Sequence, residues 1–233
     1  MPENERLATT PVRVAFKKIG SLSFISHLDL MRTVQRLLVR ADIGVYYTEG
    51  FNPHPKLVFA LPLSVGAESV TEFFDIKVMG ETADYGLILE RLRMEAPPEL
   101  PITDVYAPEK KFRDIAYAEY EIVIHHSAIP EDAADIVERM REEPIIEIKR
   151  SKSGERECDL RPFIDSLECE CSGGDLLIRT RLAADPERYL NPEYIVRAVK
   201  KVLGIESDDI APGGDYYTLT RTGIFDRDGG VFR

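Results

Sequence analysis

The hydrophobic period along this chain switches between two and about 3.6 residues. Residues 12–20, VRVAFKKIG, alternate apolar and polar side chains, which is typical of a half-buried strand. Over residues 26–41 the period lengthens, and Leu30 and Val34 share one face of a predicted amphipathic helix. Segments of these two kinds bury their apolar faces by packing helices against a sheet. The chain is therefore predicted to have an α+β fold.

The same alternation of strands and helices runs through both halves of the chain. In the first half, further strands are predicted at residues 45–49, 56–66, 71–79 and 102–107, and a second helix at 85–94. In the second half, strands are predicted at 118–127, 145–151, 159–184 and 216–226, and helices at 130–143 and 192–204. Each order is close to a split βαβ, ferredoxin-like unit with an added strand or hairpin.

A polar, proline-containing stretch at residues 107–112, APEKKF, separates the two halves. We therefore predict two ferredoxin-like domains in tandem, residues 1–108 and residues 109–233. A chain of 233 residues is long enough for two domains of about 100 residues each.

The formal net charge of −11 disfavours indiscriminate binding to nucleic acid, but the charge is unevenly distributed. Residues 1–60 hold eight Lys and Arg against five Asp and Glu, so an anionic partner would meet this part first. No apolar run approaches the roughly 20 residues of a membrane helix. A cytoplasmic protein with no membrane partner is expected.

The three cysteines, Cys158, Cys169 and Cys171, form no CxxC motif, which argues against a disulfide framework and a standard zinc or iron–sulfur site. Strand alternation places Cys169 and Cys171 on one face with Leu167, so buried core thiols are expected. No metal site and no cofactor are predicted.

The stretch EGFNPHPK, residues 49–56, is a stiff polar loop directly before an apolar run. Asn52 and His54 each precede a proline, which restricts both residues to extended conformations. Their side chains and that of Lys56 therefore project from a backbone with little freedom. We predict that Asn52, His54 and Lys56 face RNA or a protein partner.

The first helix begins with Ser26 and Asp29, whose spacing fits a capping box. His27 would then lie at the first helical position, beside free N–H groups that suit an anion. Arg32, Arg36 and Arg40 recur every four residues opposite the apolar face. Such a stripe is often only a solvated face, but three arginines also suit phosphate groups. We take all three as candidate RNA-binding or partner-binding residues.

The chain has none of the common nucleophile-elbow, P-loop, dinucleotide-binding or HExxH motifs. His27 and His54 are the candidate catalytic residues, because two imidazoles can act as general acid and base. His27, Asp29 and His54 could instead bind a metal, but residues two apart on a helix point to different sides. A non-enzymatic role is the favoured expectation.

Three motifs occur in order: FISHLDLMR, EGFNPHPK and ALPL-x-x-G-x-x-S. With them the chain closely resembles the bacterial radical-SAM-linked domain of unknown function, most strongly over residues 12–80. The chain lacks the CxxxCxxC motif of a radical SAM enzyme, so it is similar to the stand-alone partner of such a protein. The resemblance implies a radical SAM protein as partner and a setting close to RNA processing.

These observations favour an accessory RNA-binding protein that works with a radical SAM enzyme in RNA modification or processing. Two alternatives stay open at this point. One is a protein-interaction module that docks the radical SAM subunit without touching RNA, and the other is an endoribonuclease that uses His27 and His54.

Overall fold

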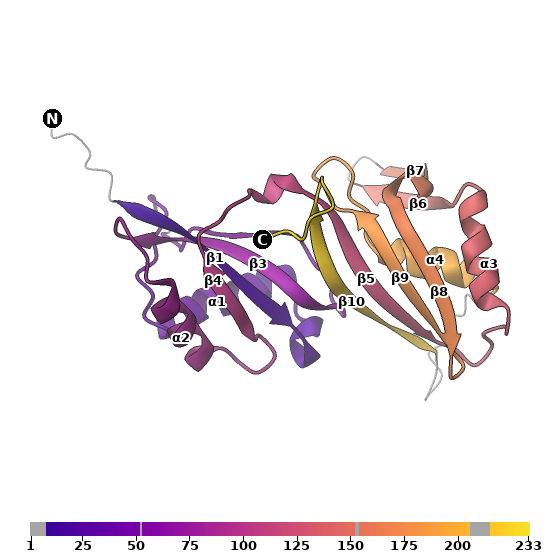
Figure 1. Ribbon diagram of the computed structural model, residues 1–233, viewed down its shortest axis with the longest axis horizontal. Helices are drawn as coiled ribbons and strands as arrows, with labels where there is room; N and C mark the ends of the chain where they lie inside the picture. The colour runs from indigo at the N-terminus through magenta and orange to yellow at the C-terminus, as the bar shows by residue number, and fades with distance from the viewer. Residues whose placement is uncertain (1–7, 52, 152–153, 206–214) are drawn as a thin grey trace. The chain divides into compact units, whose positions relative to one another are not determined.

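The computed structural model describes residues 8–51, 53–151, 154–205 and 215–233. The chain divides into two compact units, Met1–Phe112 together with Arg233, and Arg113–Phe232 (Figure 1). Both units combine helices with antiparallel strands, which confirms the predicted α+β class. No helix within these described ranges has the length and apolar character needed to cross a membrane.

The strands of the first unit are β1 (Thr9–Lys18), β2 (Leu57–Phe59), β3 (Glu68–Met79) and β4 (Ile102–Tyr106). They lie in the order β4-β1-β3-β2, and each neighbouring pair is antiparallel. The helices are α1 (His27–Arg40) and α2 (Tyr85–Glu95), with a short 3-10 helix, η1 (Gly20–Phe24), before α1.

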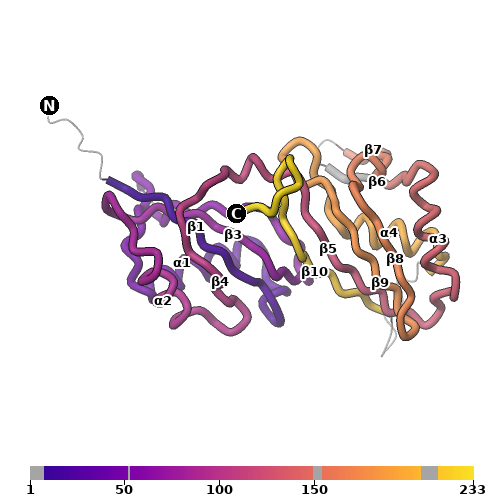
Figure 2. Tube along the Cα trace, viewed as in Figure 1, coloured from indigo at the N-terminus to yellow at the C-terminus, as the bar shows by residue number. Residues whose placement is uncertain are grey.

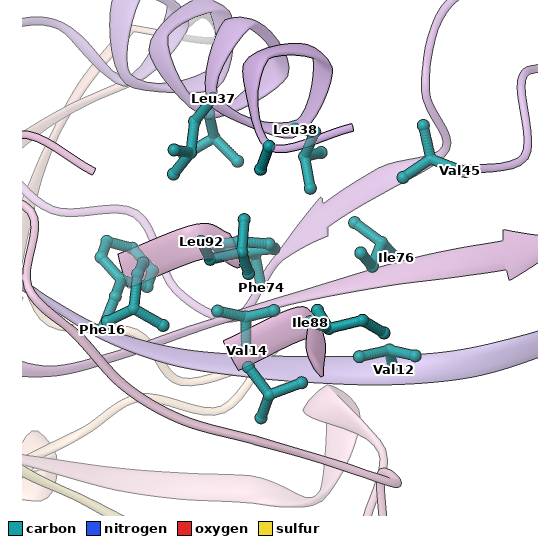
Figure 3. Packing of buried hydrophobic residues seen from close by; sticks show 14 of the residues in the cluster. Val12, Val14, Phe16, Leu37, Leu38, Val45, Phe74, Ile76, Ile88 and Leu92 are labelled. Carbon is teal, nitrogen blue, oxygen red and sulfur yellow. The ribbon is translucent and has the colours of Figure 1, made fainter. Parts of the chain in front are cut away.

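The core of the first unit lies between the helices and one face of this sheet (Figure 3). Period-two residues of β1, including Val12, Val14 and Phe16, are fully buried. They meet Leu37 of α1 and Leu92 of α2, which are also fully buried. The alternating and helical patterns of the sequence therefore converge on a single apolar layer.

The second unit has the strands β5 (Ile115–His125), β8 (Ile164–Ser172), β9 (Asp175–Ala183) and β10 (Tyr216–Asp226). They lie in the order β10-β5-β9-β8, again antiparallel, as Figure 2 traces for β5, β9 and β8. The helices are α3 (Ala133–Arg139) and α4 (Glu193–Val202), and η3 (Met140–Glu142) continues α3 as a 3-10 turn. A separate antiparallel ribbon pairs β6 (Ile146–Ser151) with β7 (Gly154–Asp159).

Two predicted strands are shorter in the structure. Residues 45–49 make only isolated bridges, Val45 to Val78 and Tyr47 to Pro55. The strand predicted over residues 56–66 is reduced to β2, and Pro62, which has no N–H to donate to a sheet, follows shortly after its end.

The helix predicted to begin at Pro130 begins at Ala133 instead, with Asp132 as its N-cap residue. The Ala133 N–H donates to the carbonyl of Pro130, so the proline precedes the helix in a turn. The helix predicted over residues 192–204 is confirmed as α4.

The prediction that Cys169 and Cys171 are buried core thiols holds only in part. Leu167 is buried and Cys169 is half-buried, but Cys171 is exposed because it lies near the end of β8, next to the Gly173–Gly174 turn. Burial, with a smaller contribution from Glu138, raises the pKa of the Cys169 thiol to about 12. Cys169 is therefore protonated and unreactive at neutral pH.

Candidate nucleic-acid interface

The loop that contains EGFNPHPK is a small hairpin attached to β3. The Tyr46 N–H donates to the Lys77 carbonyl at 2.7 Å, and the Lys56 N–H donates to the Tyr46 carbonyl at 3.0 Å. Further along, the Thr48 N–H donates to the His54 carbonyl at 2.8 Å. These bonds tie the two arms together and leave residues 49–51 and Pro53 at the tip.

His54 is fixed within this hairpin by Thr48. The Thr48 hydroxyl accepts the His54 N–H at 3.2 Å and lies 3.1 Å from the imidazole Nδ1. The ring is nevertheless exposed to solvent. The stiffness predicted from the two prolines is thus reinforced by side-chain hydrogen bonding.

Large aromatic side chains project from the same hairpin. Phe51 at the tip is fully exposed, with a relative exposure of 112%, and Tyr47 is 42% exposed. Lys56 is exposed on the returning arm. An exposed phenyl ring costs hydration free energy unless a partner covers it, so the combination of rings and a cation indicates a contact surface.

Phe51 and Tyr47 were not among the predicted site residues, although the sequence contained a signal for Phe51. A phenylalanine between Gly50 and Pro53 has no periodic apolar neighbour that would place it in a core. Asn52, a predicted site residue, lies outside the described residues.

Ser26 caps the start of α1 as predicted, but the Asp29 carboxylate has a role other than the one expected in a capping box. The Ser26 hydroxyl accepts the Asp29 N–H at 3.1 Å, as in a capping box. The Asp29 carboxylate accepts hydrogen bonds from the Ser26 hydroxyl at 2.7 Å and from Arg32 at 3.0 Å. These two bonds, that from Ser26 first, lower the pKa of Asp29 below its ordinary value of 3.8.

Asp29→Asn is expected to reduce the fall in the free energy of unfolding that occurs as the pH becomes strongly acidic. Because the folded state lowers the pKa of Asp29, its contribution is complete above pH 3.8 and is lost as the pH falls through the folded pKa. Urea unfolding from neutral to strongly acidic pH measures this effect. Glu81→Gln, at an exposed carboxylate, is the matched control. If the free energy of unfolding of Asp29→Asn fell with acidification as much as that of the wild type, the lowered pKa of Asp29 would be contradicted.

The arginine stripe of α1 is partly neutralised by neighbouring acids. Arg32 forms an ion pair with Asp29 at 3.0 Å, and Arg40 pairs with Glu95 of α2 at 3.4 Å. Arg36 is exposed and has no ion pair within the described part of the chain. Arg36 is therefore the cation of the stripe that is most available to a phosphate.

His27 and His54 are held by different neighbours. The His27 ring packs edge-to-face on Phe59, with ring centroids 5.2 Å apart, whereas His54 is bonded to Thr48. Among the described residues, no group of three or more His, Cys, Asp or Glu side chains could hold a metal ion. The convergence of both imidazoles on one phosphate stays a prediction.

Residues 12–192 match the family described as "Uncharacterized protein conserved in bacteria (DUF2344)". The chain belongs to this family. This match confirms the part of the resemblance that placed the chain in a conserved bacterial family. A comparison with curated proteins gives no match.

One similar solved structure is described as "Crystal Structure of a Cbf5-Nop10-Gar1 Complex". It is 15% identical with a TM-score of 0.50, and the alignment covers 91% of this chain and 48% of that chain. Our chain therefore spans about half the length of the solved chain that it matches, and the similarity concerns the fold alone. An unknown protein from Galdieria sulphuraria is 16% identical over 91% of this chain and 98% of its own, with a TM-score of only 0.26.

Proposed function

We propose that this protein is an accessory RNA-binding protein that works with a radical SAM enzyme in RNA modification or processing. The observation that carries the proposal is the hairpin of residues 46–56, which displays Phe51, Tyr47, His54 and Lys56 on a tied backbone. Aromatic rings stack on nucleobases while neighbouring cations contact the phosphates, and this combination is common in proteins that bind single strands.

The charge distribution supports the first unit as the RNA-binding part. It contains 14 Lys and Arg against 15 Asp and Glu, whereas the second unit contains 16 against 26. An RNA backbone is repelled by the strongly acidic second unit and meets little net charge on the first. Arg36 adds an available cation to the first unit.

The resemblance to the radical-SAM-linked domain supports the choice of partner. In this proposal the chain binds RNA and presents it, while the radical SAM protein performs the chemistry. The chain itself needs no cofactor for that task.

We also infer that the two units are tandem domains of the split βαβ, ferredoxin-like plan. The strand orders β4-β1-β3-β2 and β10-β5-β9-β8 support this interpretation, since in each unit the third strand lies between the first and second. The ribbon β6–β7 is then an insertion in the second domain.

Phe51→Ala is expected to weaken binding of single-stranded RNA about tenfold, because loss of one stacked base costs about 1–3 kcal/mol. Lys56→Ala and Arg36→Ala should each weaken binding and reduce the salt slope by about 0.7, the value for one phosphate contact. Fluorescence anisotropy with labelled oligouridine and oligoadenosine, between about 50 and about 200 mM salt, measures both effects.

Val58→Ala and Arg91→Ala provide matched controls in the same unit. Val58 is an exposed apolar residue of β2, and Arg91 is an exposed arginine paired with Asp42. Neither should change RNA affinity. The proposal fails if the wild-type chain binds no RNA at the lower salt concentration, alone or with its radical SAM partner, or if Phe51→Ala binds like Val58→Ala.

A further inference from the structure

An open groove with apolar walls lies on the second unit, where η3 leads into β6 beside the end of α4. Two adjoining hollows, of about 500 and about 310 Å³, share Met140, Pro144 and Val202 as wall residues. Ile146 lines the second hollow. The groove is therefore continuous across both hollows.

The apolar side chains of this groove are only partly covered within the unit. Ile146 is 44% exposed and Val202 is 42% exposed. Ile148, two residues along β6 on the same strand face as Ile146, is 51% exposed. Three branched aliphatic residues that remain this exposed indicate a surface that a partner covers.

Carboxylates dominate the charge around the groove. Residues 131–147 contain seven Asp and Glu against two Arg. Three of the acids, Glu142, Glu143 and Glu147, line the groove, together with the cations Arg139 and Lys201. None of the seven carboxylates forms an ion pair with another described residue. Carboxylates therefore outnumber cations beside the apolar wall residues, and a basic apolar segment is complementary to this excess of negative charge.

We propose that this groove binds a basic amphipathic helix of a protein partner. Two adjoining hollows accept apolar side chains spaced at i and i+3 or i+4 along one helix face. The polar face of that helix would direct Lys or Arg toward Glu142, Glu143 and Glu147, which line the groove. RNA does not fit this surface, because its phosphates would face the same carboxylates. The inference does not depend on RNA binding by the hairpin.

A labelled synthetic helix with Leu on one face and Lys on the other is the probe, and the full chain is the receptor. Glu142→Gln/Glu143→Gln/Glu147→Gln should weaken binding about tenfold and flatten its salt dependence, since it removes three attractive charges. Ile146→Ser/Val202→Ser should also weaken binding severalfold through lost apolar contact. Both sites are partly exposed, so these variants are expected to remain folded.

Glu81→Gln/Glu90→Gln/Glu109→Gln removes the same charge from exposed positions of the first unit and should bind the probe like the wild type. A second probe with Glu in place of Lys should not bind. The proposal is overturned if the two glutamine triples bind equally, or if the acidic probe binds as tightly as the basic one.

Two further outcomes would also overturn the proposed occupant. If sedimentation shows a dimer that Ile146→Ser/Val202→Ser dissociates, the groove holds a second copy of this chain. If single-stranded RNA displaces the helix probe from the Phe51→Ala variant, the groove binds nucleic acid. Because hairpin and groove variants are separate, failure of one proposal leaves the other measurable.

Discussion

Phe74→Ala is expected to lower the free energy of unfolding of the first unit by about 4 kcal/mol. The Phe74 ring is fully buried, and its centroid lies 5.5 Å from that of Phe16 and 5.7 Å from that of Phe59. Removing the ring deletes these contacts and leaves a cavity that the surrounding sheet and helices cannot fill. Phe59 also contacts His27, so the start of α1 loses support.

Circular dichroism during urea unfolding measures this effect, and hydrogen exchange of the α1 amides assigns it to the first unit. The chain contains no tryptophan, so a single Trp introduced by Phe112→Trp would add a local fluorescence signal. Val58→Ala, at a half-exposed position of β2, should change stability by less than about 0.5 kcal/mol. A loss below about 1 kcal/mol in Phe74→Ala would show that the aromatic cluster is not packed as described.

Arg13→Ala is expected to destabilise the first unit by about 3 kcal/mol, because it leaves a partly buried carboxylate without its partner. The Arg13 side chain is fully buried and forms a two-point ion pair with Asp75, at 2.8 and 2.9 Å. It also donates to the Lys110 carbonyl at 2.9 Å, and its guanidinium lies 4.3 Å from the centre of the Phe112 ring. The residue therefore links β1 to β3 and to the segment after β4.

Arg13→Lys should restore little of this stability, since an ammonium group cannot bind both carboxylate oxygens and stack on a ring. Arg91→Ala is the control, because its ion pair with Asp42 is exposed and should contribute at most about 1 kcal/mol. Equal unfolding midpoints for Arg13→Ala and Arg91→Ala would contradict the central role of Arg13.

The local sequence predicted the elements whose apolar residues recur with one period. The helix predicted at residues 26–41 is α1, since its hydrophobic face and its Ser26 cap are encoded within one short segment. The alternating segment from residue 12 lies in β1 for the same reason. The predicted bounds were wrong near two prolines. The strand predicted over residues 56–66 ends before Pro62, and the helix predicted from Pro130 begins at Ala133.

The candidate site depended more on tertiary structure. The spacing of Arg32, Arg36 and Arg40 predicted one cationic stripe, but Glu95 from α2, 55 residues further along, neutralises Arg40. No pattern within a short segment predicts an ion pair between two separate helices. The stiffness of the loop before His54 could be predicted from its prolines, whereas the exposure of Tyr47 could not, because exposure depends on which distant residues cover a side chain.

The sequence by itself determined the α+β class, the helix cap at Ser26 and the acidic excess of the second half, because propensity, capping and charge are properties of short segments. Only the tertiary structure decided which charges are paired and which apolar residues remain uncovered. Ile146 and Val202 are 56 residues apart, and they share a groove because η3, β6 and α4 pack together. Long-range packing brings such residues close together, and the hydrophobic periodicity of a short segment does not predict that packing.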